Sequence, residues 1–247
     1  MRRGASAPRP QCLRRAAAFA LVAVWSLPTL ALAQAPDLDA GRGVVVGGED
    51  ASITPCFVCH GLDGVGDSAG AFPRLTGQAA FYMYKQLIDY ASEARPHDVM
   101  TPIAREMTEP QMADVAFYYS VLDAPHARRP AVEPAVLARG RQIAEDGLPE
   151  AGVQACNLCH GAGGAGNPPL FPYLAGQYAP YTELQMQLFK RGARANDALG
   201  VMRDIAEDLR DEDIRAVALY FEWLRPAEDD KQAGARVGAR ERERTGG

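Results

Sequence analysis

The strongest constraint on the fold is a five-residue motif, Cys-x-x-Cys-His, that occurs at 56–60 and again at 156–160. Two further segments recur at nearly the same spacing: Phe72–Gln78 as Phe171–Gln177, and Met100–Ala104 as Met202–Ala206. Self-similarity at a fixed period indicates repeated structural units. The chain of 247 residues is therefore predicted to contain two copies of one unit.

The last segment of each copy predicts an amphipathic helix. Apolar residues recur at i, i+3, i+4, i+7 and i+10, which places them on one helical face. They are Met112, Val115, Ala116, Tyr119 and Leu122 in the first copy, and Ile214, Val217, Ala218, Phe221 and Leu224 in the second. Thr108 and Gln111 have the spacing of a capping box, and Pro110 suits a first helical turn. With no convincing run of alternating strand residues, the predicted fold class is all-α.

Composition gives the segment boundaries. Residues 36–125 and 134–225 are predicted to form two tandem helical domains, which we call the first half and the second half. Each is expected to hold a helix, the Cys-x-x-Cys-His segment, a Gly/Pro-rich loop, a helix, a Met-bearing loop and a final helix. Residues 126–133 form the linker. Residues 226–247 are polar with alternating charge, which predicts a disordered tail.

Residues 1–33 are predicted to be a signal peptide. Five arginines and no acidic residue precede an apolar run that ends in Ala31-Leu32-Ala33, a small-x-small cleavage pattern. An uncleaved membrane anchor is the alternative, although Pro28 interrupts a run that is already short for a span. The predicted location is the periplasm.

The charge balance is acidic. Without residues 1–33 the chain has 21 Lys and Arg against 31 Asp and Glu, a net charge of −10. Residues 36–125 carry a net charge of −8 and residues 133–225 a net charge of −4. An acidic surface argues against nucleic acid or an anionic membrane as the main partner. The charge serves either solubility or docking, and peripheral membrane association stays open.

Cys-x-x-Cys-His is the attachment signature of c-type haem. Two thiols three positions apart can reach both vinyl groups of one porphyrin, and the adjacent histidine then lies beneath the iron. The sequence predicts two covalently bound haem c groups. The thiols are Cys56, Cys59, Cys156 and Cys159, and the axial histidines are His60 and His160.

Three other uses of these cysteines fit the sequence less well. A thioredoxin-like motif belongs in a βαβ pattern, which the sequence does not predict. A zinc ribbon places its cysteine pairs about 15–20 residues apart, whereas Cys59 and Cys156 are 97 apart. Two disulfides are compatible with export. The matched repeat favours haem over all three.

The second axial ligand is predicted from the repeat. Among the methionines after residue 33, Met100 and Met202 match each other, 41 and 43 residues after the second cysteine of their motifs. The other methionines are predicted to pack in cores. His97, whose position in the second half is a leucine, is an alternative ligand to Met100. His126 falls at the linker.

With these motifs, residues 37–225 resemble the cytochrome c4 family, dihaem proteins of two tandem class I cytochrome c domains. The Phe-Pro-x-Leu-x-Gly-Gln segments and the tandem arrangement carry the resemblance. It implies that the carbonyls of Pro73 and Pro172 accept hydrogen bonds from Nδ1 of His60 and His160. It further implies a pseudo-twofold pairing of the domains, with the haems facing each other.

The predicted function is electron transfer and not catalysis, because a methionine on each iron leaves no open position for a substrate. The expected role is a periplasmic carrier between a donor, either a quinol-oxidising complex or a dehydrogenase, and a terminal oxidase in a respiratory chain. One alternative is a dihaem subunit of a periplasmic dehydrogenase such as a flavocytochrome. The other is a dihaem enzyme, a peroxidase or a thiosulfate dehydrogenase.

Overall fold

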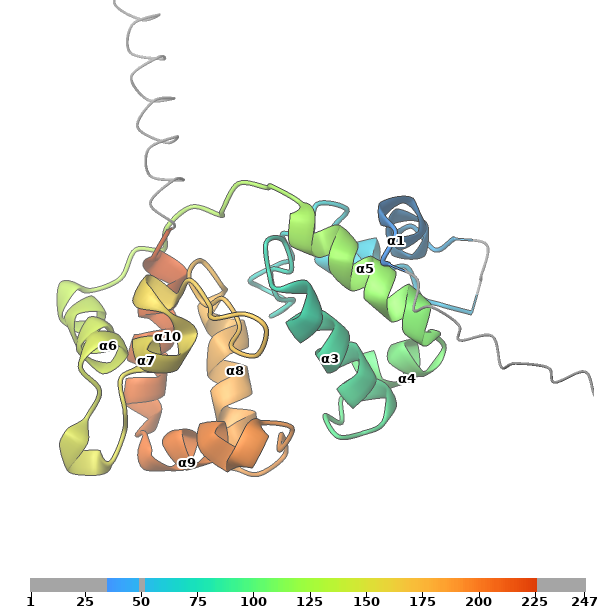
Figure 1. Ribbon diagram of the computed structural model, residues 1–247. Helices are drawn as coiled ribbons and strands as arrows, with labels where there is room; N and C mark the ends of the chain where they lie inside the picture. The colour runs from blue at the N-terminus through green and yellow to red at the C-terminus, as the bar shows by residue number, and fades with distance from the viewer. Residues whose placement is uncertain (1–34, 49–51, 226–247) are drawn as a thin grey trace, which may run out of the picture. The chain divides into compact units, whose positions relative to one another are not determined.

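A computed structural model describes residues 35–48 and 52–225 (Figure 1). Every regular element in this part of the chain is helical. The three isolated β-bridges found there each close a short loop. The prediction of an all-α fold is confirmed. The predicted signal peptide and the predicted tail lie outside the described residues.

The described helices follow the same order in both halves. In the first half they are α1 (Leu38–Val45), α2 (Phe57–His60), α3 (Ala80–Ala91), α4 (Met100–Arg105) and α5 (Glu109–Val121). In the second half they are α6 (Pro134–Glu145), α7 (Cys156–His160), α8 (Ala179–Lys190), α9 (Val201–Asp208) and α10 (Asp211–Trp223). Short 3-10 turns, η1 (Pro149–Ala151), η2 (Ala162–Gly164) and η3 (Ala198–Gly200), occur in the second half.

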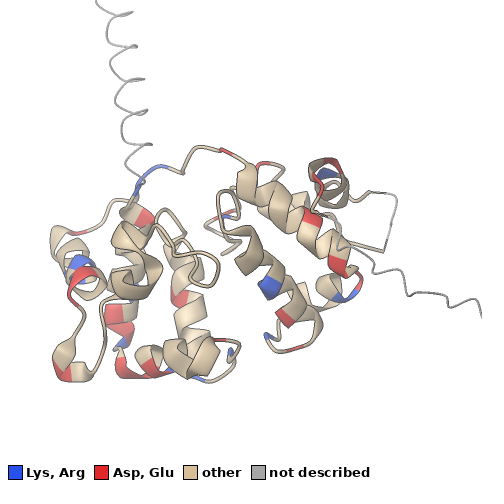
Figure 2. Cartoon of the chain, in the orientation of Figure 1, with Lys and Arg blue, Asp and Glu red and all other residues tan. Residues whose placement is uncertain are grey.

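The final helices begin with different side-chain contacts. At the start of α5, Thr108 and Gln111 form a complete capping box, which confirms that prediction. At the start of α10, acidic residues fill the first turn (Figure 2). One of them, Asp213, is only 2% exposed and accepts hydrogen bonds from Nε of Arg139 at 2.7 Å and of Arg210 at 2.9 Å. Arg139 belongs to α6, so this carboxylate also joins two helices.

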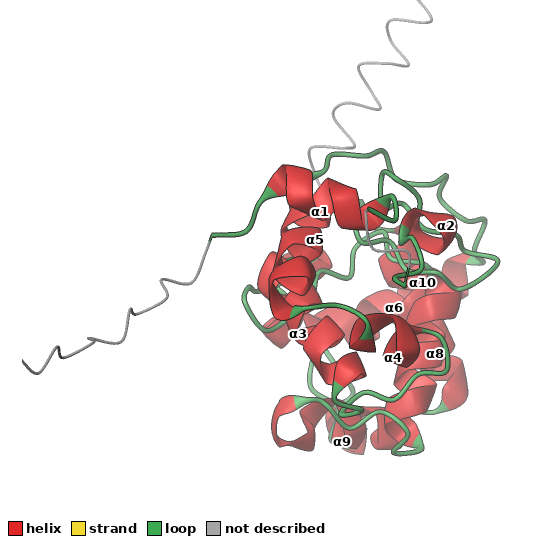
Figure 3. Ribbon diagram, turned by 90° about the vertical axis from the view of Figure 1, so that its right-hand side faces the viewer, coloured by secondary structure: helices red, strands yellow, loops and turns green. Residues whose placement is uncertain are grey.

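The first helix of each half crosses the last one at a glycine (Figures 1 and 3). A Cβ on Gly41 of α1 would overlap the carbonyl oxygen of Asp114 in α5. A Cβ on Gly140 of α6 would overlap the carbonyl oxygen of Ala216 in α10. Glycine therefore permits the close approach of the two backbones in both halves.

Each half has its own hydrophobic core. The predicted apolar faces of α5 and α10 lie in these cores, with Tyr119 and Phe221 each 2% exposed. Val45 and Ile143, from α1 and α6, are fully buried against them. The prediction of these two apolar helical faces is confirmed. Each core ends at the attachment segment of its own half, because Cys56 packs on one and Cys156 on the other.

The segment between the halves is held at both ends. The guanidinium of Arg74 donates hydrogen bonds to the carbonyls of Ala124 and Pro125, where the first half ends. Further along, Arg129 lies over the Trp223 ring at 4.7 Å and donates from Nε to the Trp223 carbonyl at 3.0 Å. The described residues, 35–48 and 52–225, group as one compact unit. Among the described helices, none has the length and apolar character needed to cross a membrane.

Candidate functional site

The two Cys-x-x-Cys-His segments form short helices, α2 and α7. Each ends at its histidine and is followed by a glycine at φ 77°, Gly61 or Gly161, which turns the chain away. The four cysteines are free thiols. The two members of each pair are three residues apart, so both thiols of a pair lie on the same side of one helical turn.

Burial makes the first thiol of each pair a weak acid. It raises the pKa of Cys56 to about 11 and that of Cys156 to about 11. Both groups are therefore neutral thiols near neutral pH, and they pack as apolar side chains against the two cores. A porphyrin attached through these thiols would therefore lie against the same core.

The histidines are held through a single ring nitrogen. Nδ1 of His60 donates to the carbonyl of Pro73 at 3.2 Å, and Nδ1 of His160 donates to the carbonyl of Pro172 at 2.9 Å. These are the two contacts that the family resemblance implies. Burial lowers the pKa of both histidines, while the proline carbonyls act in the opposite direction. A neutral imidazole with Nδ1–H engaged leaves Nε2 as the nitrogen that can bind a metal.

The methionines differ from the sequence prediction in their local structure. We predicted a loop at Met100 and Met202, but Met100 is the first residue of α4 and Met202 is the second residue of α9. Side chains that precede the methionines in the chain accept hydrogen bonds from the methionine N–H groups, at the start of each helix. Nδ1 of His97 accepts from the Met100 N–H at 3.1 Å, and Oδ2 of Asp197 accepts from the Met202 N–H at 2.8 Å. Both methionines pack against the core of their half.

The other histidines and methionines that could bind iron have different contacts. His97 accepts the N–H groups of Val99 and Met100, which favours a capping role over iron ligation. His126 lies against Gly176 in the second half. The remaining methionines of the described chain, Met83, Met107, Met112 and Met186, are each less than 9% exposed and belong to the cores.

A cleft of about 520 Å³ adjoins the attachment segment of the first half. Cys59 lines it, together with Pro102 and Ile103 from α4 and Glu106 at the end of that helix. A motif thiol and apolar side chains of the methionine helix thus line one space, which is compatible with a covalently attached porphyrin, although neither His60 nor Met100 lines it. The residues present therefore fit a c-type haem.

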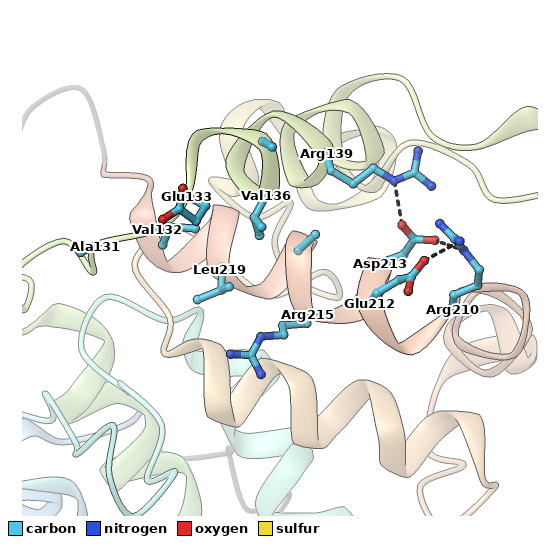
Figure 4. A pocket seen from close by; sticks show the side chains of 12 residues that line it. Ala131, Val132, Glu133, Val136, Arg139, Arg210, Glu212, Asp213, Arg215 and Leu219 are labelled. Atoms are coloured by element: carbon cyan, nitrogen blue, oxygen red, sulfur yellow. Dashed lines mark hydrogen bonds and ion pairs between the residues drawn. The ribbon is translucent and has the colours of Figure 1, made fainter.

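A second groove, of about 640 Å³, lies between the linker, α6 and α10 (Figure 4). Its apolar part includes Val136 and Leu219, and at one end Arg139 and Arg210 both point to Asp213. A hydrogen bond from Arg139, joined by one from Arg210, holds the pKa of Asp213 below its usual range. None of the predicted haem residues lines this groove, and the ion pairs account for its charged end.

Two buried arginines at the contact between the halves escaped the sequence analysis. Arg95 and Arg194 are 4% and 6% exposed, and each donates to glutamines of both halves. Nη2 of Arg95 donates to Gln185 at 2.6 Å, and Nη2 of Arg194 donates to Gln86 at 3.1 Å. The sequence does show that the two arginines match each other in the repeat, because Arg95 lies nine residues after Gln86 and Arg194 lies nine residues after Gln185.

Comparison with known proteins gives relatives for most of the chain. Residues 150–221 match the family model for cytochrome c oxidase, cbb3-type, subunit III. A cytochrome c4 from Thiocapsa roseopersicina is 38% identical over 180 residues, covering 72% of this chain and 91% of the relative. A thiosulfate dehydrogenase electron acceptor from Stutzerimonas stutzeri is 36% identical over 188 residues, covering 76% of this chain and 87% of the relative.

Solved structures show that the fold of this chain is also similar to that of known proteins. Reduced recombinant cytochrome c4 from Pseudomonas stutzeri superposes with a TM-score of 0.68 at 32% identity, over 77% of this chain and all of that one. Thiosulfate dehydrogenase from Marichromatium purpuratum gives a TM-score of 0.71 at 36% identity. That match covers 76% of this chain and 40% of the larger protein.

The repeated helical fold, the two attachment motifs and these relatives define a class of protein, the electron-transferring c-type cytochromes with two haems. Within that class, the chain belongs to the cytochrome c4 family. The predictions of the family and of c-type haem as the cofactor are confirmed.

Proposed function

We propose that this protein is a periplasmic electron carrier with one methionine-ligated haem in each half. In this proposal Cys56 and Cys59 bind the first haem, with His60 and Met100 as its axial ligands. Cys156 and Cys159 bind the second haem, with His160 and Met202 as its axial ligands. The carbonyls of Pro73 and Pro172 orient the two axial histidines.

One observation carries the proposal. In each half, the first cysteine of the attachment motif and the matched methionine pack against the same hydrophobic core. When bound there, the haem supplies reversible one-electron chemistry. The thioether of a methionine favours Fe(II) and raises the reduction potential, which suits a carrier. Two six-coordinate irons have no open position for a substrate, so we propose that the protein is not an enzyme.

The haem content gives the first test. Mass spectrometry of the exported protein should show two added haem masses that survive denaturation. The oxidised protein should show the weak near-infrared sulfur-to-iron band at about two haem equivalents. A single haem, haem that extracts into acidified organic solvent, or a high-spin iron would contradict the proposal.

For the physiological donor, we favour a periplasmic dehydrogenase over a quinol-oxidising complex, with a terminal oxidase as acceptor. The support is that two relatives, at 36% and 37% identity, are thiosulfate dehydrogenase electron acceptors. The purified protein can be mixed with a thiosulfate dehydrogenase and thiosulfate while its haem absorbance is followed. Reduction that needs both the enzyme and its substrate is expected. Reduction by a quinol-oxidising complex alone would favour the other donor.

Export is tested by the N-terminus of the purified protein. The mature chain should begin just after Ala33, and the protein should appear in the periplasmic fraction. A chain that keeps residues 1–33 and sediments with membranes would instead support the uncleaved anchor.

A further inference from the structure

Two glutamines join the halves through reciprocal contacts with the main chain. Gln177 of the second half accepts the N–H of Arg74 at 2.9 Å and donates from Nε2 to the carbonyl of Arg74 at 2.9 Å. Gln78 of the first half makes the same pair of bonds with Tyr173, both at 3.0 Å. The contact is thus made twice, once in each direction.

The neighbouring residues determine the orientation of both side-chain amides. Oε1 of Gln177 also accepts the N–H of Tyr178 at 3.1 Å, and Oε1 of Gln78 also accepts the N–H of Ala79 at 3.0 Å. A flipped amide would point its NH₂ group at two N–H donors. The oxygen of each glutamine therefore faces the other half.

The peptide that receives this contact is also the one that holds an axial histidine. Between Pro73 and Arg74, the carbonyl accepts Nδ1–H of His60 at 3.2 Å, while the N–H of the same peptide donates to Gln177. Between Pro172 and Tyr173, the carbonyl accepts Nδ1–H of His160, while the N–H donates to Gln78. Each histidine is thus linked through one peptide group to a glutamine of the opposite half.

Hydrogen bonds in such a chain strengthen each other. An acceptor on the peptide N–H increases the negative charge on the carbonyl oxygen, so that oxygen accepts Nδ1–H more strongly. A stronger bond at Nδ1 makes the imidazole a better electron donor to iron, which stabilises the oxidised state. Water competes little here, because Gln78, Gln177 and Arg74 are 6%, 7% and 7% exposed.

We propose that each glutamine is a positioning residue for the haem of the other half, and that it lowers the reduction potential of that haem. Gln177 acts on the first haem through the Pro73–Arg74 peptide and His60. Gln78 acts on the second haem through the Pro172–Tyr173 peptide and His160. This inference rests on the proposed ligation by His60 and His160, which the haem count and the near-infrared band of the unaltered protein test separately.

The experiment is a crossed pair of variants in the haem-loaded protein, with a redox titration followed by NMR so that each haem is titrated by its own resonances. Gln177→Leu should raise the potential of the first haem and leave the second unchanged. Gln78→Leu should raise the potential of the second haem and leave the first unchanged. In the reduced protein, the NMR resonance of Nδ1–H of the affected axial histidine should shift upfield, as expected for a weaker hydrogen bond.

Gln185→Leu is the matched control. Gln185 is also 7% exposed and bonds across the contact between the halves to Arg95, but it touches neither proline peptide. The Gln185→Leu variant should leave the Nδ1–H resonances of both axial histidines unchanged. If Gln177→Leu fails to fold, Gln177→Met keeps the length of the side chain without the amide acceptor. A shift confined to the haem of the altered half, equal shifts of both haems, or an unchanged His60 Nδ1–H would overturn the proposal.

Discussion

The first turns of α5 and α10 are both stabilised by side-chain contacts, but the chemistry of these contacts differs. In α5, the neutral side chain of Thr108 accepts the N–H of Gln111, and the side chain of Gln111 accepts the N–H of Thr108. In α10, Asp213 takes the position that Gln111 has in the first half, and ion pairs with Arg139 and Arg210 replace the capping box. The repeat preserves the helix and its apolar face, while the contacts that begin the helix are free to change. The second half therefore depends on charge where the first does not.

Replacing each methionine separately tests whether the halves bind haem in the same way. Met100→Ala and Met202→Ala should each remove half of the near-infrared band and lower one potential, by on the order of 0.1 V, because a neutral thioether favours Fe(II). Near-infrared spectroscopy and a redox titration measure both effects. The core variant Met107→Leu is the control and should change neither. If Met100→Ala leaves both sites intact while His97→Ala disturbs one, the first-half assignment is wrong.

The glycine crossings test whether the two halves pack equally tightly. Gly41→Ala and Gly140→Ala should each destabilise their half by about 2 kcal/mol, because the new methyl group overlaps a carbonyl oxygen of the facing helix. Gly43→Ala is the matched control within α1, since a Cβ there meets nothing within 4 Å. It should be neutral or stabilising by up to about 1 kcal/mol. Chemical denaturation measures all three, and equal stabilities of Gly41→Ala and Gly43→Ala would contradict the packing argument.

The ionic start of α10 should make the second half sensitive to acid. Asp213→Asn should destabilise it by about 1.5–3 kcal/mol at neutral pH, the usual contribution of a hydrogen bond to a charged group. The folded pKa of Asp213 lies below its ordinary value, so the unfolded chain takes up the proton first. The stabilisation is therefore complete above the unfolded pKa, about 3.9, and is lost as pH falls through the folded pKa.

Denaturant unfolding of the unaltered protein and of Asp213→Asn, at several pH values from neutral to below 4, measures this dependence. The difference in unfolding free energy between the two proteins should shrink as the pH falls below about 4. A difference that stays constant over this range would show that Asp213 acts through its shape and not through its charge.

Removing the neutral cap of α5 should lower the free energy of unfolding by less than removing Asp213 does, and the loss should not depend on pH. Thr108→Ala removes the capping side chain and should cost about 1 kcal/mol. The loss should be the same at neutral pH and below pH 4, in contrast to Asp213→Asn. Thr108→Ser, which keeps the hydroxyl acceptor, should restore most of the stability. A loss that grows or shrinks with pH would mean that a charged group takes part at this end.

The smallest expected difference concerns the reduction potentials. The first half has a net charge of −8 and the second, over residues 133–225, a net charge of −4, and negative charge stabilises the oxidised iron. Screening limits the effect to on the order of tens of millivolts, with the first haem at the lower potential. Redox titrations at low and high salt, with each haem identified, measure the order. A first haem that titrates higher at both salt concentrations would contradict this prediction.

Much of the fold could be predicted because its signals are local or repeated. The apolar faces of α5 and α10 follow the helical period, and the Thr108–Gln111 box spans three residues. The haem motif is compact, and Met100 and Met202 could be matched because the repeat supplies an internal alignment. Short helices at these methionines were missed, because their N-cap residues, Val99 and Gly200, make no side-chain cap. The side chains that accept the first helical N–H groups, those of His97 and Asp197, lie further back in the chain.

The family resemblance implied that the two domains pair, but the residues that contact each other between the halves could not be predicted. Gln78 and Gln177 were visible as repeated residues, but their partners lie 95 and 103 residues away along the chain. Spacing cannot show which main-chain group a buried amide meets at that distance. The same holds for Arg95 and Arg194: their matched positions, nine residues after Gln86 and Gln185, mark them as repeated, but repetition alone does not show that they are buried between the halves.

The anchored linker has a consequence for the kinetics of the pair. Arg74 binds the carbonyls of Ala124 and Pro125, Arg225 binds the carbonyl of Ala127, and Arg129 binds Trp223. Little unattached chain therefore remains between the two cores. If the glutamine contacts open, a short tether of this kind keeps each half at a high effective concentration for the other. Closing is then a unimolecular event, and its rate should not change when the protein is diluted.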